Sequence, residues 1–372
     1  MATVHYDSRL IQPGDTFICL PKGDGFIEDA RRRGATDVRS MTRVEMAAFA
    51  DDYYDHPSKD LTLIGVTGTN GKTTVTYFVS EVLKAAGFKP AVIGTLNSAL
   101  TTPESLDVQS KMAAHLKEGG THFVMEVSSH GIDQGRVLNM DFDVKCLTNI
   151  TQDHLDYHKT FEAYSKTKQS FMKEYPGQSI YPDKYPTLPR TFQSPLLGAF
   201  NRDNIRACLA ICRACDVPDE VTIKVLSTIK APPGRFEQVD VGQPYLVIVD
   251  YAHTPDSLDN VLITARQIAE DRDGRLIVVF GCGGDRDRGK RPQMGRIAQD
   301  HSDVVVVTQD NPRSENPTQI MTDILEGMDT TQPLAIVQDR AAAIERAIDQ
   351  AEPKDVVVIA GKGHETYQIL AT

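Results

Sequence analysis

The sequence predicts an α/β protein built from three consecutive blocks, and three observations indicate this fold class. Continuous apolar runs alternate with helical stretches through the second and third blocks, as in parallel sheets covered by helices on both faces. The 372 residues suffice for two or three domains of ordinary size. Pro232-Pro233 marks a hinge-like boundary, because proline excludes helix and stiffens the chain. We expect domains at residues 1–58, 59–231 and 232–372.

The composition excludes several classes of protein. The chain is 40% hydrophobic and 24% charged, and its formal net charge of −11 disfavours broad binding to nucleic acid or anionic membrane. No apolar run approaches the roughly 18 residues that cross a bilayer, and the first ten residues lack a signal-peptide pattern. Six cysteines in a chain of this length are not a disulfide framework. We expect a cytoplasmic protein with no nucleic-acid partner and no membrane span.

The first two blocks differ in size and in pattern. The first ends in the acidic, turn-like stretch at residues 51–57 and is too small to bury much core alone, so we expect it to lean on the second block. The second block opens with a strand, a Gly-rich turn and a helix, and residues 175–197 read as irregular because they carry five prolines. Strands are predicted at Leu61–Val66, Phe123–Val127 and Val144–Leu147, and helices at Thr74–Ala86, Phe161–Tyr175 and Asn201–Cys215.

The third block carries polar signatures directly after its predicted strands. The strands are Leu246–Val249, Leu276–Phe280, Val304–Val307, Leu334–Val337 and Val356–Ala360. The polar stretches DYAH, GCGGDR, DNPR and GKGHE follow four of them. Because ligands of open α/β sheets bind beyond the carboxyl ends of the strands, we expect these four clusters to form one site.

The stretch from Gly68 to Thr73 lies between a predicted strand and a predicted helix, where a Gly-rich loop cradles phosphates. Lys72 would reach the outer phosphates and the Thr73 hydroxyl would bind Mg²⁺. The usual spacing places a glycine where this chain has Val66, so a shorter variant of the loop is implied. The alternative is a Gly-rich turn with a solvated lysine.

Glu126 ends one predicted strand and His154 follows another, on the same edge as this loop. A carboxylate there suits Mg²⁺, a hard ion that prefers oxygen. Taken alone, Glu126 is more often a solvated strand end and His154 a hydrogen-bonded turn residue. The phosphate loop beside them favours the metal-binding interpretation.

Lys168 falls within the apolar stripe of the predicted helix at residues 161–175, whereas Lys166 and Lys173 fall on its solvent side. One interpretation is snorkelling, with the stem buried and the amine in water. The other is that the amine faces the metal–phosphate site. Burial lowers the pKa of a lysine, and a neutral amine reacts with CO₂ to give an anionic carbamate.

The spacing of Cys208, Cys212 and Cys215 is also that of some iron–sulfur sites. These residues lie on one face of the predicted helix at residues 201–215, so we interpret them as small buried hydrophobes.

Together these motifs resemble the Mur ligases, ATP-dependent enzymes that form amide bonds in peptidoglycan precursor synthesis. The type that adds meso-diaminopimelate to a UDP-muramoyl dipeptide is the most similar. The resemblance implies a reduced N-terminal nucleotide-sugar-binding-like domain, a central P-loop ATPase-like domain and a C-terminal Rossmann-like ligase domain that binds the incoming amino acid. It rests on TGTNGKT, MEVSSHG, TNITQDHLDYH, DYAHTPD, FGCGGDRDRGKRP, DNPR and GKGHE.

The resemblance also implies roles for individual residues, with ATP, Mg²⁺ and a carbamate on Lys168 as cofactors. The catalytic set is Lys72, Glu126, His154 and Lys168, and the metal set is Thr73, Glu126, His154 and Lys168. The ATP set is Gly68, Thr69, Asn70, Gly71, Lys72, Thr73, Thr74, Asn149, Arg235, Asp250 and His253. The carrier set is Ser8, Thr101, Thr102, Ser128, Gln134 and Arg136. The amino-acid set is Arg286, Asn311, Arg313, Gly361 and Glu365.

Two departures from the family pattern keep alternatives open. The first block is short, although the stretches at residues 7–9 and 13–15 survive, and the stretch from residue 168 to residue 201 is short as well. The two short stretches therefore leave open how the chain would bind the UDP end of the carrier. The alternatives are a non-catalytic or regulatory ATP-binding relative, and a ligase with a different amino acid or carrier. We expect a monomer, with room for an accessory partner that completes the site.

Overall fold

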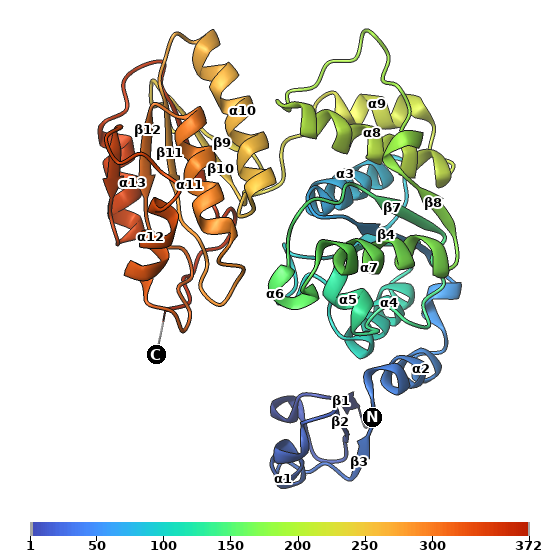
Figure 1. Ribbon diagram of the computed structural model, residues 1–372. Coiled ribbons are helices and arrows are strands. Elements are labelled where there is room, and N and C mark those ends of the chain that lie inside the picture. The colour runs from blue at the N-terminus through green and yellow to red at the C-terminus, as the bar shows by residue number, and fades with distance from the viewer. Residues whose placement is uncertain (1–2, 371–372) are drawn as a thin grey trace.

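The computed structural model describes residues 3–370. Its strands form three sheets of three, five and six strands, which follow one another along the chain. Figure 1 shows the small first block at one end of the second block and the third block beside the second. The described part of the chain holds no helix long and apolar enough to cross a membrane. The α/β architecture predicted from the sequence is confirmed.

The first block is a small parallel sheet followed by a connecting helix. Its elements are β1 (Val4–His5), β2 (Thr16–Cys19), α1 (Ile27–Arg32), β3 (Asp37–Ser40) and α2 (Arg43–Tyr53). Ile18 of β2 packs with Met46 and Ala50 of α2 and with Leu106 of α4 (Ser105–Lys117) in one apolar cluster. The first block therefore shares a core with the second block, as its small size predicts.

The second block is a parallel sheet in the order β5-β6-β4-β7-β8. Its strands are β4 (Thr62–Thr67), β5 (Pro90–Ile93), β6 (His122–Val127), β7 (Val144–Leu147) and β8 (Gln178–Ile180). One apolar cluster holds α3 (Lys72–Ala85), α8 (Ala199–Ala214) and α9 (Asp219–Leu226). A separate cluster holds α4, α5 (Ser129–Asp133) and α7 (Phe161–Glu174). Because the strands are parallel, the loops after β4, β6 and β7 meet at one edge of the sheet.

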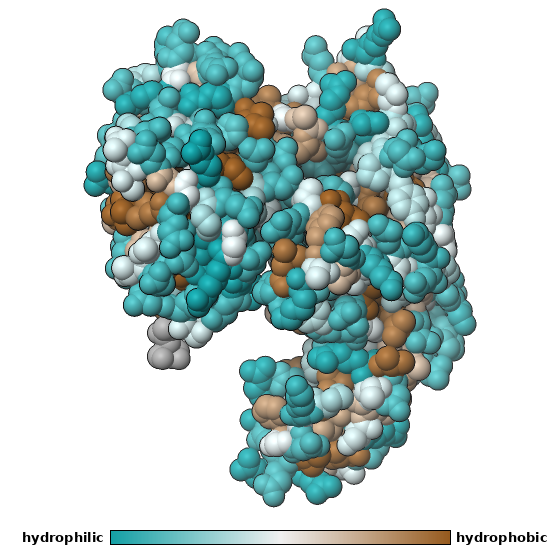
Figure 2. Space-filling view, viewed as in Figure 1, coloured by the Kyte–Doolittle hydropathy of each residue, from teal (hydrophilic) through white to brown (hydrophobic). Residues whose placement is uncertain are grey.

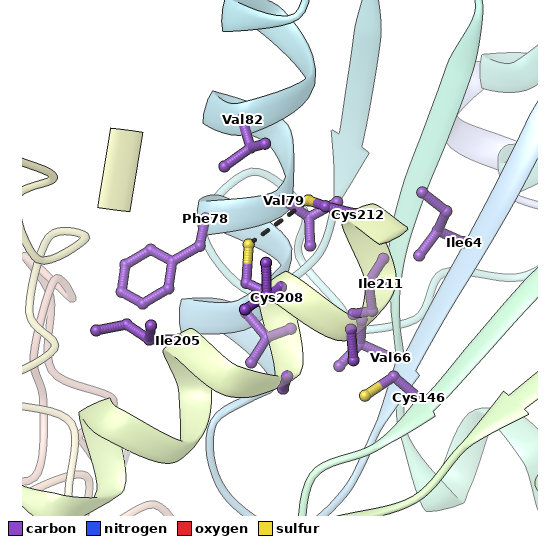
Figure 3. Close-up of a cluster of buried hydrophobic side chains, with 14 of the residues drawn as sticks. Ile64, Val66, Phe78, Val79, Val82, Cys146, Ile205, Cys208, Ile211 and Cys212 are labelled. Atoms are coloured by element: carbon purple, nitrogen blue, oxygen red, sulfur yellow. Dashed lines mark hydrogen bonds between the residues drawn. The ribbon is translucent and has the colours of Figure 1, made fainter. Parts of the chain in front are cut away.

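The cysteines of α8 lie in the first of these cores. The Sγ atoms of Cys208 and Cys212 are 3.8 Å apart, and Figure 3 shows them among Phe78, Val79 and Ile205. Burial raises the pKa of the Cys208 thiol above its ordinary value, so the protonated, apolar form is favoured. The cysteines therefore act as core side chains, as the face of the helix predicts.

The third block is a six-stranded sheet in the order β13-β12-β11-β14-β10-β9, in which only the β9–β10 pair is antiparallel. Its strands are β9 (Glu237–Val239), β10 (Leu246–Asp250), β11 (Leu276–Phe280), β12 (Val304–Val307), β13 (Leu334–Ile336) and β14 (Val356–Ala360). Helices α10 (Pro255–Asp271), α11 (Lys290–His301) and α12 (Pro317–Leu325) pack on one face, and α13 (Arg340–Asp349) packs on the other. The buried central strands explain the near-continuous apolar runs of this block.

Candidate functional site

A cleft of about 1110 Å³ lies between the second and third blocks. The residues that line it range from Thr69 to Tyr367, and they follow the carboxyl ends of strands in both sheets. Figure 2 shows an open gap between the third block and the small first block. The cleft is thus built from the second and third blocks.

The Gly-rich loop connects β4 to α3 at the floor of this cleft. Gly68 has a φ of +148° and Gly71 a φ of +86°, conformations that favour glycine, and a Cβ at Gly68 would overlap the Thr148 hydroxyl. Lys72 is the first residue of α3, and its Nζ donates to the carbonyls of Gly68 at 2.8 Å and Thr69 at 2.9 Å. The loop therefore presents an ammonium group and a helix N-terminus together, which suits a polyphosphate.

Thr73 and Glu126 form an oxygen pair beside the loop. The Thr73 hydroxyl donates toward both carboxylate oxygens of Glu126 at 3.0 Å, and it accepts from the Arg235 guanidinium at 3.0 Å. The Glu126 side chain is almost fully buried, and one of its oxygens also accepts the Thr95 N–H at 2.8 Å. A hydroxyl and a buried carboxylate in contact fit Mg²⁺, which takes hard oxygen ligands.

Lys168 projects from α7 to the underside of the same loop. Its side chain is 1% exposed, and its Nζ donates to the Gly68 carbonyl at 2.8 Å, the same oxygen that Lys72 contacts. Burial, together with the nearby Lys72 charge, holds the pKa of Lys168 well below its usual value. The amine is directed inward to the loop rather than outward to solvent.

His154 lies at the mouth of the same region, directly before the short helix α6 (Leu155–His158). Its Nε2 is 3.3 Å from the Asp153 carboxylate, and its ring lies 4.8 Å from that of His130. Burial lowers the pKa of His154, which favours the neutral imidazole. A neutral imidazole is the form that ligates metals.

The third block supplies the opposite wall of the phosphate region. Asp250, at the end of β10, accepts backbone N–H groups from Phe236 at 2.6 Å and Ala252 at 2.7 Å. Burial raises its pKa to about 6. The Arg235 guanidinium stacks 4.3 Å from the centre of the Tyr251 ring while reaching Thr73. His253 and Asn149 also line the cleft, so the residues predicted to surround the nucleotide lie together.

Asp256 joins the two walls, although it was not among the residues predicted from the sequence. This residue lies in the first turn of α10 and accepts from the Asn70 amide at 2.7 Å and from the Thr151 hydroxyl at 3.2 Å. Its position in the DYAHTPD stretch, one of the stretches that carry the family resemblance, could have marked it as a candidate site residue. Its role as a bridge could not be predicted, because it depends on the packing of two domains.

Most of the predicted carrier residues form one hydrogen-bonded group beside Glu126. Thr102 donates to the Glu126 carbonyl at 2.8 Å and accepts the Ser128 N–H at 2.9 Å. Arg136 donates to the Thr102 carbonyl at 2.8 Å and to the Gln134 side chain at 2.6 Å. Thr101 lies alongside, with its hydroxyl 3.1 Å from that of Thr95.

Ser8 is placed differently from the other carrier residues. Its side chain is buried within the first block, where the hydroxyl donates to Asp29 at 2.9 Å. It does not belong to the lining of the cleft. The structure therefore does not bring Ser8 together with the rest of the predicted set.

The predicted amino-acid residues gather on the third-block side of the cleft. Arg313 donates to the Gly284 carbonyl at 2.8 Å, and burial and the neighbouring Arg286 charge lower its pKa. Neither arginine has a carboxylate within ion-pair distance among residues 3–370. Glu365 accepts from Lys362 at 2.7 Å and from Asn311 at 3.3 Å. The guanidinium groups of Arg286 and Arg313 thus have no ion-pair partner among the described residues, and the Glu365 carboxylate lies nearby. This arrangement suits a ligand that carries both a carboxylate and an ammonium group.

The structure thus brings most of the predicted residues together. Gly68 is the first residue of the phosphate loop, Lys168 contacts its carbonyl from below, Gln134 accepts from Arg136, and Ser8 lies apart. The remaining predicted residues line the cleft: Thr69, Asn70, Gly71, Lys72, Thr73, Thr74, Thr101, Thr102, Glu126, Ser128, Arg136, Asn149, His154, Arg235, Asp250, His253, Arg286, Asn311, Arg313, Gly361 and Glu365.

Comparisons with known proteins agree with this geometry. A ligase of Solibacter usitatus named UDP-N-acetylmuramoyl-L-alanyl-D-glutamate--2,6-diaminopimelate ligase is 40% identical over 445 aligned residues, covering 98% of this chain and 89% of the relative. The ligase of the same name from Geobacillus thermodenitrificans is 38% identical, covering 100% and 91%. Because these alignments are longer than the 372 residues of the chain, the relatives contain segments that it lacks.

Solved structures and family matches extend this likeness. A structure of a ligase of the same name is 32% identical with a TM-score of 0.62, covering 99% of this chain and 91% of the other. The fold also matches MurF ligase from Thermotoga maritima in complex with ADP, at 16% identity and a TM-score of 0.71, covering 98% and 94%. Residues 66–187 match the Mur ligase middle domain, and residues 234–363 match the domain described as Mur ligase, glutamate ligase domain. The chain belongs to the Mur ligase family.

Proposed function

We propose that the chain is an ATP-dependent ligase that joins meso-diaminopimelate to UDP-N-acetylmuramoyl-L-alanyl-D-glutamate in peptidoglycan precursor synthesis. One observation carries this proposal: the phosphate loop, the Thr73–Glu126 oxygen pair and the Arg286–Arg313 pair face a single cleft. ATP, a metal ion and the amino acid that accepts the acyl group can therefore meet in this cleft. The names of the full-length relatives support the choice of substrates.

The residues present fit the nucleotide and its metal. The backbone N–H groups after Gly68 and the Lys72 ammonium would hold the outer phosphates. The Thr73 hydroxyl and the Glu126 carboxylate would hold one Mg²⁺, and the His154 imidazole would hold another. When bound, the metal neutralises phosphate charge. Arg235 contacts Thr73 from the third block, so it adds positive charge at the same place when the two walls close.

Lys168 is proposed to act as a carbamate. Its low pKa leaves a neutral amine, which forms an N–C bond with CO₂ and releases one proton. The product is an anionic oxygen ligand in place of a buried cation. This change would also remove the repulsion between Lys168 and Lys72 at the Gly68 carbonyl.

The chemistry proceeds through an acyl phosphate. A carboxylate oxygen of the carrier attacks the γ-phosphorus, the bond to ADP breaks, and the acyl group gains a good leaving group. The neutral amine of the amino acid then attacks the acyl carbon, phosphate departs and the amine loses a proton. In the proposal, Arg286 and Arg313 hold the distal carboxylate of the amino acid and Glu365 its distal ammonium. Rate enhancement comes from positioning and charge neutralisation, so no general base is assigned.

A second candidate is a ligase of the same type that depends little on the UDP end of its carrier. The separation of Ser8 from the cleft favours it, and so does the extra length of the relatives. Comparing phosphate release from ATP with the intact carrier and with the same muramoyl dipeptide lacking UDP separates the two candidates. Comparable rates would favour the second candidate.

The acceptor is tested by an amino-acid panel scored by phosphate release, followed by Arg313→Ala. We expect diaminopimelate to give the fastest release. The alanine variant should raise its KM by about tenfold or more, because a charge-assisted contact is lost, with the KM for ATP unchanged. Arg288→Ala is the matched control, since Arg288 is an exposed arginine of the neighbouring loop that pairs with Glu315. Equal effects of Arg313→Ala on both substrates would mean that the acceptor site is misassigned.

A further inference from the structure

Residues 366–370, here called the C-terminal strap, fold back onto the loop that carries the proposed acceptor residues. Gln368 donates its side-chain amide to the Asp310 carbonyl at 2.7 Å. The Ile369 N–H donates to Oδ1 of Asn311 at 2.9 Å, and the Ile369 carbonyl accepts the Arg313 N–H at 3.1 Å. Three hydrogen bonds therefore tie the strap to residues 310–313.

The strap holds a strained part of this loop. Arg313 has a φ of +52°, a left-handed conformation that costs a non-glycine residue on the order of 1 kcal/mol and persists only where neighbours enforce it. Its backbone N–H is the group that the strap carbonyl accepts. Since φ sets the direction of the side chain, the strap helps to aim the Arg313 guanidinium into the cleft.

The strap also fixes Asn311 and, through it, Glu365. Oδ1 of Asn311 accepts both the Ile369 N–H and the Lys362 ammonium, the latter at 3.0 Å. With Oδ1 held by two donors, the amide nitrogen faces Glu365 at 3.3 Å. Lys362 is buried, contacts Glu365 at 2.7 Å, and lies 5.4 Å from the centre of the Tyr367 ring of the strap.

We propose that the C-terminal strap is a positioning element that sets affinity and selectivity for the incoming amino acid, with Gln368 as its anchor. This inference rests on the proposed function, because it concerns the acceptor side of the same cleft. The hydrogen bonds of the strap go to the loop at residues 310–313, whereas the phosphate loop has partners of its own. Loosening the strap should therefore disturb the amino acid and leave ATP binding unchanged.

The test uses Gln368→Met, which keeps the length of the side chain and removes its donor. We expect the KM for diaminopimelate to rise by about fivefold, the effect of one hydrogen bond worth about 1 kcal/mol, with the KM for ATP unchanged. The preference for diaminopimelate over lysine should fall. Gln368→Lys retains a donor and should restore much of the loss. Gln319→Met is the control, because Gln319 is exposed on α12 and its side-chain amide donates to Asp323 of its own helix.

A second measurement separates failure of the strap from failure of the proposed function. Hydrogen exchange is followed by mass spectrometry on peptides that contain the Arg313 amide, with no substrate present. Faster exchange in Gln368→Met than in the wild type and Gln319→Met would support the strap. Unchanged exchange, or equal rises in the KM for ATP and diaminopimelate, would overturn it. A wild-type protein without amino-acid-dependent phosphate release would overturn the proposed function, and the exchange result would still decide the strap.

Discussion

Two lysine ammonium groups converge on one carbonyl oxygen at the floor of the cleft, that of Gly68. Lys168 is almost fully buried and Lys72 is partly buried, and like charges repel more strongly in a low-dielectric interior than at the surface. The pair is therefore costly while both groups are charged. Deprotonating Lys168 removes this repulsion. Converting its amine to a carbamate would change the charge of the side chain from positive to negative.

Substitution of Lys168 tests this interpretation. Lys168→Ala should abolish most ATP turnover, because it removes the ligand that the carbamate would provide. Added short carboxylates such as acetate or propionate should restore part of the phosphate release. Lys166→Ala, on the exposed side of the same helix, is the control and should retain activity. Full activity in Lys168→Ala would remove the residue from the mechanism.

At the level of single residues, periodicity placed Lys168 on the apolar face of its helix but did not decide whether its amine points inward or snorkels to water. Strand ends placed Glu126 and His154 on the edge that holds the phosphate loop. Local sequence determines these features, because they depend on one helix face or one strand end. Sequence gave no comparable signal for the bridge from Asp256 to Asn70. That contact joins residues from two blocks, so it depends on how two independently formed sheets are packed together.

Helix α7 carries Lys168 to the loop, and a second buried lysine holds the C-terminal end of this helix. Lys145 of β7 is 1% exposed, and its Nζ donates to the carbonyls of Met172 at 2.9 Å, Phe171 at 3.4 Å and Tyr175. These carbonyls lie at the C-terminal end of α7, where intrahelical donors are lacking and the helix dipole is negative. The ammonium thus satisfies orphan acceptors and anchors the helix to the sheet.

Replacing Lys145 should destabilise this part of the protein. Lys145→Met keeps the volume but leaves the carbonyls unpaired, which should cost about 2–3 kcal/mol, or roughly 5–10 °C in the melting temperature of the second block. Scanning calorimetry measures the shift. Lys166→Met makes the same chemical change on the exposed face of α7 and should melt within about 1 °C of the wild type. Equal shifts in the two variants would show that Lys145 does not anchor the helix.

At the level of elements, the long apolar runs located β7, β11, β12 and β14 at the predicted residues. The two edge strands of the second-block sheet, β5 and β8, were not predicted. Strand β8 lies in the proline-rich stretch, and its pairing with β7 is a tertiary contact that its own three residues do not indicate. The C-terminal strap likewise depends on tertiary contacts that its own residues do not indicate, because its hydrogen bonds go to residues 310–313, which are far away in the sequence.

At the scale of the whole molecule, the first block is attached to the second through the start of α4. Glu104, directly before α4, is 4% exposed and lies between two arginines. Arg43 of α2 donates its Nε to both carboxylate oxygens at 3.0 and 3.1 Å. Arg136 of the proposed carrier site approaches within 3.3 Å. Because α4 follows Thr101 and Thr102, this ion-pair group connects the first block to the carrier residues.

Glu104→Gln should therefore change two properties at once. Removing a buried charge that pairs with two arginines costs about 3–5 kcal/mol locally, so the first block should separate more readily and trypsin should cut faster near Arg43. The KM for the carrier should rise by about tenfold or more, because Arg136 loses its ionic support, while the KM for ATP stays constant. Glu118→Gln, exposed just beyond the other end of α4, is the matched control. If the Glu104 variant resisted trypsin like the wild type and kept its carrier KM, the first block would be attached by apolar packing alone, through Ile18, Met46 and Leu106.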